Sequence, residues 1–297
     1  MKAKRRFNIW LWVLLCVPCL LTSCDHDVHD GEEEGGLSVS LTWADEADQG
    51  TEVKDVKLWI FNANDGSLVE EKQYGGAQEV ASQRFQLPEG TYRILTTTNL
   101  TEPFFISEQT RSLTNWNNIQ IGLTNPKDVR NNAYFGVVDV KIDNKEGSYV
   151  VQNPMKSVLS ELTIIIENIP KGTEMSGKAL DCACCLFPTQ KNSDGEYGLP
   201  SIEPTEVELP TLLATESTLK SEVIRLMPTI QGSSASHVYL RLLLPTGTLQ
   251  EFDITAPKMN VGGKYELRFK YEEMQPKMNL DATINGWTNL NNEVETK

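Results

Sequence analysis

The sequence predicts an all-β protein made of two tandem antiparallel β-sandwich domains. Apolar and polar residues alternate over residues 37–43, and again in the run that carries Val56, Leu58 and Ile60; this period of two is typical of half-buried strands. Residues 62–66, Asn-Ala-Asn-Asp-Gly, follow the second run, and Asp-Gly between apolar runs is a strong hairpin signal. No segment shows a long helical period, so the regular spacing of short strands and turns favours sandwiches.

Further strand-like segments follow along the chain, separated by turn residues. We expect strands at residues 56–61, 84–87, 91–97, 134–142, 162–167, 178–187, 222–227, 238–244, 248–254, 264–271 and 279–284. Residues 190–221 are rich in Pro, Ser, Thr and Glu, and this composition predicts a long loop.

An internal echo indicates that the two domains are of the same kind. Residues 87–94 read LPEGTYRI and residues 260–267 read NVGGKYEL, so each holds Gly-x-Tyr-x-aliphatic at the start of a strand. Glycine permits the positive φ that such a turn can require. Turn residues and Pro154 interrupt the strands within 144–156. We therefore place the domains at 37–150 and 151–297.

The beginning of the chain has the layout of a secretory signal that ends at a cysteine. Four basic residues between positions 2 and 6 precede an apolar run from Phe7 to Leu21, and two small residues stand directly before Cys24. The run falls short of the roughly 20 apolar residues of a spanning helix. The pattern resembles the bacterial lipobox, so we predict a signal peptide over 1–23 and lipidation of Cys24. More than one acyl chain there would give stable membrane anchoring.

The segment that follows the lipidated cysteine is acidic and rich in glycine. Residues 24–36 carry six acidic residues and three glycines, and such a segment buries too little apolar surface to order itself, which predicts a tether. Acidic residues at this place also resemble the surface-export signal of lipoproteins in some anaerobic Gram-negative bacteria. Without residues 1–23 the chain keeps 23 basic against 41 acidic residues, a formal net charge of −18. This charge argues against nucleic acid and anionic membrane surfaces as direct partners.

Three cysteines remain beyond the tether, Cys182, Cys184 and Cys185, and three thiols cannot all pair within one chain. Their spacing is not the paired C-x-x-C arrangement of a zinc site. On a strand the first two would face one way and Cys185 the other, which suits small buried apolar residues. We expect core packing, with a metal site and a disulfide or reactive thiol as the alternatives.

Few residues offer catalytic or metal-binding chemistry. The histidines are His26 and His29 in the tether, which could bind a metal only loosely, and His237, which we expect at the start of a strand. No Ser/His/Asp set, His-Glu-x-x-His motif or phosphate-binding glycine loop is present, so we expect no enzyme, no cofactor and no metal. Asn62 and Asp65 begin like a calcium loop but lack the later bidentate acid, which favours an ordinary turn.

Aromatic residues suggest one further possibility. Trp43, Trp59, Trp116 and Trp287 could stack on a sugar ring, although such residues more often fill a sandwich core. An exposed Trp116 or Trp287 beside polar groups would favour a surface lipoprotein that binds glycan or another host or nutrient ligand.

Several of these motifs together resemble a known family. The lipobox, residues 56–69 (VKLWIFNANDGSLV), the turn at 87–94, Gly263-Lys-Tyr-Glu-Leu and Ile284-Asn-Gly-Trp are similar to FimB-like fimbrial anchor and minor-subunit lipoproteins of anaerobic Gram-negative bacteria. The resemblance implies two transthyretin-like sandwiches, a palmitate-type lipid that holds Cys24 in the outer membrane at the cell surface, and binding to other fimbrial subunits by strand addition.

The position of the first arginine bears on the role within such a fibre. In the wider group that this chain resembles, the polymerising proteins are matured by cleavage after an arginine near the N-terminus. Here no arginine lies between Cys24 and Arg84, which we place inside the first domain. Loss of a short N-terminal strand by that route is not expected, and this favours a permanent anchor over a stalk subunit.

Overall fold

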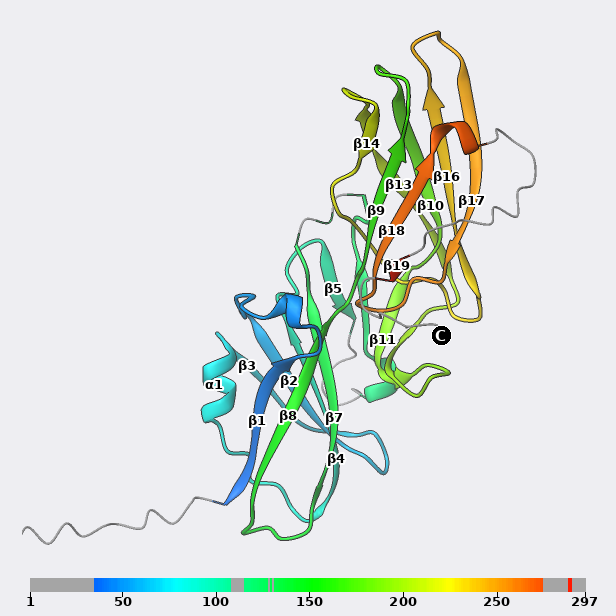
Figure 1. Cartoon of the computed structure of the whole chain (residues 1–297). Helices are drawn as coiled ribbons and strands as arrows, with labels where there is room; N and C mark the ends of the chain where they lie inside the picture. Colours follow the sequence, from blue (N-terminus) through cyan, green and yellow to red (C-terminus); the bar gives the residue numbers. More distant parts are fainter. Residues whose placement is uncertain (1–34, 108–114, 128, 130, 275–287, 290–297) are drawn as a thin grey trace, which may run out of the picture. The chain divides into compact units, whose positions relative to one another are not determined.

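The computed structural model describes residues 35–107, 115–127, 129, 131–274 and 288–289. Within these residues the chain is almost entirely β-structure, and the one α-helix is the six-residue α1 (Ala77–Ser82) (Figure 1). Three 3₁₀ turns accompany it: η1 (Glu46–Asp48), η2 (Trp116–Asn118) and η3 (Tyr271–Glu273). The predicted all-β fold class is confirmed, and two of the strand pairings described below are parallel.

The first sandwich is built on a six-stranded sheet with the order β1-β8-β7-β4-β2-β3. Its strands are β1 (Gly36–Trp43), β2 (Val56–Asn62), β3 (Leu68–Tyr74), β4 (Gly90–Thr98), β7 (Tyr134–Ile142) and β8 (Ser148–Ser157). Strand β1 runs parallel to β8 over its whole length, while the other neighbours are antiparallel. Alternation in β2 sends Val56, Leu58 and Ile60 to a core beneath α1, as predicted, and sends Trp59 and Phe61 to the opposite face.

A four-stranded sheet with the order β12-β11-β6-β5 contributes to the core on that opposite face. Its strands are β5 (Phe104–Ser107), β6 (Gln120–Leu123), β11 (Cys185–Lys191) and β12 (Tyr197–Pro200). Ile121 and Leu186 belong to the same apolar cluster as Trp59, Leu95 and Phe135. The division of the chain at residue 150 stays a prediction, and the strands of this sheet come from both sides of it.

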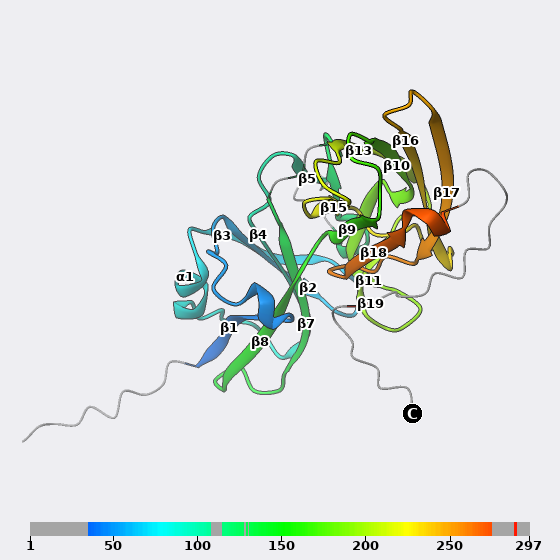
Figure 2. The same cartoon turned by 45° about the horizontal axis from the view of Figure 1, so that its top comes forward.

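The second sandwich consists of two further sheets that face each other (Figure 2). One has the order β13-β10-β16-β17 and comprises β10 (Glu174–Ala183), β13 (Pro204–Leu213), β16 (Ala235–Leu243) and β17 (Leu249–Pro257). The other has the order β14-β9-β18-β19, and β15 also pairs with β9; its strands are β9 (Ser160–Glu167), β14 (Thr218–Lys220), β15 (Ile224–Leu226), β18 (Lys264–Lys270) and β19 (Thr288–Asn289). Alternating residues such as Ile164, Ile166, Leu240 and Leu242 fill the space between the sheets and are fully buried.

Some predicted elements differ from the structure. The long loop expected at 190–221 is wrong, because it contains β12, β13 and β14. Strand β13 tolerates Pro204 and Pro210 because it lies at a sheet edge, where a missing N–H breaks no ladder bond. Strand β8 likewise runs through Pro154, which we expected to interrupt it. At 84–87 only Phe85 forms a bridge, to Leu37. The strand expected at 279–284 lies outside the described residues.

The strand predicted over 178–187 is two strands in two different sheets. The chain bends at Cys184, between β10 and β11. Just before the bend, Asp181 has φ of 58° and the β10–β13 register shifts between Ala179 and Cys182. An irregularity of this kind reorients a strand, so the chain passes from one sandwich to the other at this point.

Gly-x-Tyr occurs four times in the chain, and at three of these places the tyrosine hydroxyl bonds to a backbone group of the preceding turn. The Tyr92 hydroxyl donates to the Pro88 carbonyl at 2.8 Å, and the Tyr265 hydroxyl accepts the Asn260 N–H at 2.8 Å. In the third copy, Gly147-Ser-Tyr149, the tyrosine hydroxyl accepts the Asn144 N–H at 2.9 Å. None of the three glycines has a positive φ. The expected reason for glycine is therefore wrong: a Cβ at Gly263 would stand 2.6 Å from the tyrosine oxygen, so the turn needs the space.

Candidate functional site

The first strand, which follows the predicted tether, is firmly built into the fold. Leu37 and Val39 are fully buried, and eight residues of β1 pair with β8. On its other side, Leu37 and Phe85 exchange two backbone hydrogen bonds of 3.0 and 2.9 Å. Cys24, the predicted lipidation site, lies outside the described residues, as do His26 and His29, and its role stays a prediction.

Arg84 lies just before the bridging residue Phe85. Its guanidinium donates to the carbonyls of Ala81 and Gln83 at 3.4 and 3.1 Å, and the side chain is solvent-exposed. Cleavage after Arg84 would separate β1, β2, β3 and α1 from the remaining strands of a shared core. An arginine in this place therefore does not release a short N-terminal strand.

Sheet edges are the surfaces through which a β-sandwich can accept a further strand, because their N–H and C=O groups face outward. The two edges of the β13-β10-β16-β17 sheet differ. Strand β13 carries Pro204 and Pro210, and its pairing with β10 shifts register twice. Strand β17 pairs with β16 in unbroken register over nine residues and has no proline before Pro257. Within the part of the chain that the structure describes, β17 ends the sheet and is its most regular edge.

The hydrogen-bond phase along β17 follows from the hairpin that precedes it. The Leu244 N–H donates to the Thr248 carbonyl at 2.9 Å. Hydrogen-bonded pairs alternate with non-hydrogen-bonded pairs in an antiparallel ladder. The backbone groups of Asp253 and Thr255 therefore point away from β16, toward the open edge. The Asp253 side chain is exposed, while its neighbours Phe252 and Ile254 are buried in the core.

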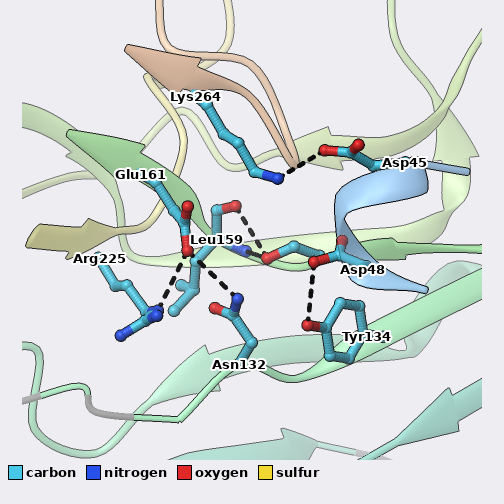
Figure 3. Close-up of polar contacts among 9 residues, drawn as sticks. Asp45, Asp48, Asn132, Tyr134, Leu159, Glu161, Arg225 and Lys264 are labelled. Carbon is cyan, nitrogen blue, oxygen red and sulfur yellow. Dashed lines mark hydrogen bonds and ion pairs between the residues drawn. The ribbon is translucent and has the colours of Figure 1, made fainter. Parts of the chain in front are cut away.

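A polar junction connects elements of the two sandwiches (Figure 3). Lys264 of β18 pairs with Asp45, which follows β1, at 2.6 Å. The carboxylate of Asp48 accepts a hydrogen bond of 3.4 Å from the Tyr134 hydroxyl. Burial raises the pKa of Asp48, and the nearby ammonium of Lys264 opposes that effect. Burial lowers the pKa of Lys264, but the hydrogen bond to Asp45 and the negative charges of Asp45, Asp48 and Glu161 together outweigh it, so the net shift in pKa is upward.

A second part of the junction surrounds Glu161 of β9. Its carboxylate accepts from the Asn132 amide at 3.3 Å and lies 3.3 Å from Nε of Arg225 (Figure 3). The Ser157 hydroxyl, at the end of β8, donates to the Leu159 carbonyl at 3.0 Å. These contacts hold the connection between β8 and β9 in one conformation.

The tryptophans within the described residues do not form a common platform. Trp59 is fully buried, and Trp43 packs edge-on against Tyr134 with the ring centroids 4.9 Å apart. Trp116 is half-buried, and the guanidinium of Arg93 covers its ring at 3.9 Å. That ring face is therefore occupied, although Trp116 was one of the residues proposed from the sequence for sugar stacking. Trp287 lies outside the described residues.

The cysteines are arranged differently from the expected alternation. Cys182 and Cys185 are buried, whereas Cys184 is half-buried at the bend, where its sulfur lies 3.3 Å from the Ser201 hydroxyl and 3.8 Å from the Cys185 sulfur. The expectation that Cys182 and Cys184 share a face is wrong because the strand ends between them. Burial raises the pKa of Cys182 to about 12, and burial together with Cys184 raises that of Cys185 to about 11.

The remaining candidates have structural partners. His237 lies on β16 and its Nδ1 is 2.6 Å from Asp181 Oδ2, while Val238, Leu240 and Leu242 face the core. Asp65 accepts the N–H and hydroxyl of Ser67 at 2.9 and 2.6 Å, which caps the turn after β2. Among residues whose positions are described, no three acidic, histidine or cysteine side chains form a potential metal site.

The fold places this chain among all-β proteins built from two sandwiches. The chain belongs to the family of fimbrillin-A associated anchor proteins Mfa1 and Mfa2, whose model matches residues 23–293. The family resemblance noted in the sequence is confirmed, and the protein is fimbria-associated. No curated protein matches the chain.

Solved structures share the fold at low sequence identity. The fimbrial anchor protein Mfa2 from Porphyromonas gingivalis has 15% identity and a TM-score of 0.54, with 80% of this chain and 90% of that chain covered. A proposed adhesin from Bacteroides thetaiotaomicron has 12% identity and a TM-score of 0.52, with 80% and 92% covered. A protein from the same organism, proposed to bind polysaccharide, has 10% identity and a TM-score of 0.54, with 81% and 94% covered. Within the described residues no helix is long and apolar enough to cross a membrane.

Proposed function

We propose that this protein is the anchor or a minor subunit of a fimbria and is held in the outer membrane, at the cell surface, by lipid on Cys24. Two observations together carry the proposal. Leu21–Cys24 resembles a lipobox, and the model of the fimbrial anchor family matches the chain from residue 23 onward. Two or more acyl chains on one cysteine provide anchoring that a single chain does not. The acidic residues of 24–36 then space the folded domains from the bilayer.

The firmly paired β1 supports an anchor rather than a stalk subunit. A sandwich that has lost a strand offers a groove for a partner's strand, but here the first strand fills its place with buried Leu37 and Val39. The subunit next in the fibre would bind at an edge that is already present. We assign this role to β17, because its outward N–H and C=O groups can pair with an incoming strand and its exposed Asp253 favours a basic side chain opposite.

The anchoring step is tested by Cys24→Ala, with Cys184→Ala as the matched control that removes a thiol from the folded part. Cells that express each variant are fractionated, and fimbriae are counted on the cells and in the medium. We expect Cys24→Ala to leave the membrane fraction and to shed fimbriae, while the control behaves like the natural protein. Retention of Cys24→Ala protein and fimbriae on the cells would contradict the proposal.

Strand addition is tested separately at Asp253. Proline there removes an outward N–H without breaking a bond to β16, whereas alanine keeps that N–H. Crosslinked pull-downs from intact cells should recover pilin subunits with Asp253→Ala and at least about tenfold less with Asp253→Pro. Circular dichroism checks that both variants fold. Equal recovery with both would exclude β17 as the binding edge and leave the lipid anchor unaffected.

A further inference from the structure

An open cavity of about 480 Å³ lies beside the polar junction, away from the β17 edge. Its walls come from loops that are distant in sequence: residues 51–55 before β2, 99–101 after β4 and 131–132 before β7. Tyr134 and Arg225, both visible in Figure 3, complete the lining. The cavity is thus bounded by parts of both sandwiches.

The lining is polar throughout. All ten lining residues carry hydrogen-bonding side chains, and none is aliphatic. Glu52 and Asp55 supply carboxylate acceptors, Lys54 and Arg225 supply cationic donors, and asparagines supply both kinds of group. A lipid would find no aliphatic side chain here. A simple anion would meet the Asp55 carboxylate, because Lys54 is already paired with Glu52 at 2.8 Å and Arg225 with Glu161 at 3.3 Å. The lining thus presents closely spaced hydrogen-bond donors and acceptors. A polyhydroxylated molecule can match them, because each of its hydroxyl groups both donates and accepts.

The loops that form the cavity are held in place by their own hydrogen bonds. The Asn99 side chain accepts the Lys54 N–H at 2.9 Å and donates to the Glu52 carbonyl at 3.0 Å. Thr98 adds a hydrogen bond of 2.6 Å to the Lys54 carbonyl. Asn99 and Asp55 adopt φ of 59° and 50°, a conformation that non-glycine residues keep only where their surroundings hold it. The backbone of the cavity loops is therefore fixed before any ligand binds.

The opposite wall is equally fixed. Asn132 is bound to Glu161, which also pairs with Arg225, and the Tyr134 hydroxyl is bound to Asp48. Asn131 and Thr101 on the rim are exposed and reach solvent. A ligand would thus meet a rigid interior and an accessible rim, which is the usual arrangement of a preformed binding site.

We propose that this cavity binds a neutral saccharide unit, with Asp55 and Asn131 among the residues that contact its hydroxyls. The volume accommodates a mono- or disaccharide, and the neighbouring carboxylates disfavour acidic sugars. This binding is independent of the anchoring function, since neither residue lies on β17 or in the tether. It would give the fimbrial protein a contact with surface or host glycans.

Saturation-transfer NMR on the Cys24→Ala protein tests the proposal with galactose, mannose, N-acetylglucosamine and lactose, with sialyllactose as the acidic probe. Calorimetric titration with CaCl₂ serves as the cation probe. Asp55→Asn removes the charge but keeps a residue that tolerates positive φ, and Asn131→Ala removes a rim amide. Asp253→Asn, on β17, is the matched control.

We expect saturation transfer to at least one neutral sugar, with affinity at least about tenfold lower in Asp55→Asn and Asn131→Ala and unchanged in Asp253→Asn. Transfer to none of the neutral sugars would overturn the proposal. So would binding that both cavity variants retain, or a cavity that responds only to calcium.

Discussion

The phenolic hydroxyl of Tyr197 donates a hydrogen bond of 2.7 Å to the carboxylate of Asp139, which lies 58 positions earlier in the chain. The same carboxylate accepts Nε of Arg93 at 2.7 Å, and the Arg93 guanidinium lies between the rings of Trp116 and Tyr197. This cluster fastens β12 to β4 and β7, and so holds the four-stranded sheet against the six-stranded one.

Tyr197→Phe should lower the free energy of unfolding by about 1 kcal/mol, because it removes one hydrogen bond to a carboxylate and keeps the ring that packs on Arg93. Urea unfolding followed by fluorescence measures the change. Tyr271→Phe is the matched control, since its hydroxyl bonds only to the neutral Gln250 at 3.1 Å, and its effect should be smaller. An equal effect of the two would argue against a special role for the cluster.

The stability that Asp139 contributes should depend on pH. Burial alone would raise the pKa of Asp139, but the hydrogen bonds from Arg93 and Tyr197 outweigh it and hold that pKa below its usual range. Because the folded-state pKa is lowered, the contribution is complete above the unfolded value of about 3.9 and is lost as the pH falls through the folded value. Asp139→Asn should therefore be less stable than the natural protein at pH 7, and the difference should shrink below about pH 4. A constant difference across that range would refute this account.

Lys264 and Asp45 should be energetically coupled across the junction. Their side chains are only 21% and 30% exposed, so water screens the pair less than it screens a surface pair. A double-mutant cycle with Lys264→Gln and Asp45→Asn should give a coupling energy of about 1 kcal/mol that weakens in 1 M salt. The exposed pair Lys54 and Glu52 serves as the comparison, with a coupling near zero.

Gly263→Ala should destabilise the protein by about 1 to 3 kcal/mol, because the new methyl group would overlap the Tyr265 hydroxyl and displace it from the Asn260 N–H. Gly76→Ala is a suitable control, since its nearest neighbour would be the Val53 carbonyl at an ordinary 3.4 Å. Thermal unfolding of the two variants should separate them clearly. Similar melting temperatures would mean that the turn adapts to a side chain.

The three cysteines of the folded part should differ in reactivity. Thiolates are the reactive species, and Cys182 and Cys185 are buried with a pKa raised to about 12 and about 11. In Cys24→Ala protein at pH 8, iodoacetamide should modify the half-buried Cys184 at least about tenfold faster than the other two, as read by mass spectrometry. Denaturant should abolish the difference. Labelling of Cys182 at the rate of Cys184 in the folded protein would contradict the buried assignment.

The elements that could be predicted from sequence are those whose own pattern decides their structure. Strand β2 shows this, since its alternation correctly places Ile60 on one face and its Asp-Gly turn ends it. Strand β13 was missed because prolines disguise its alternating Val207 and Leu209, and only its place at a sheet edge makes them acceptable. The bend at Cys184 has no periodic signal, because it is determined by the two sheets that β10 and β11 must join.

The candidate sites depend still more on tertiary structure. The sequence left open whether Trp116 fills the core or stacks on a sugar, and the arginine that covers its ring lies 23 positions away on β4. The cavity that contains Asp55 and Asn131 is formed by loops that no local pattern brings together. The signal predicted at Leu21–Cys24 is the opposite case, since a signal of this kind would be recognised as a linear sequence and would need no fold.

The double-sided pairing of β1 also has a mechanical consequence. A pull on the chain ahead of Gly35 enters the folded body through β1, which is bonded to β8 along its length and to Phe85 at Leu37. Gly36 adds a bond of 2.8 Å to the Gly147 carbonyl at the point where the load arrives. Drawing β1 out would also expose Leu37 and Val39 to water. Tension applied ahead of Gly35 would therefore be shared among many bonds at once, because β1 is held by β8 on one side and by Phe85 on the other.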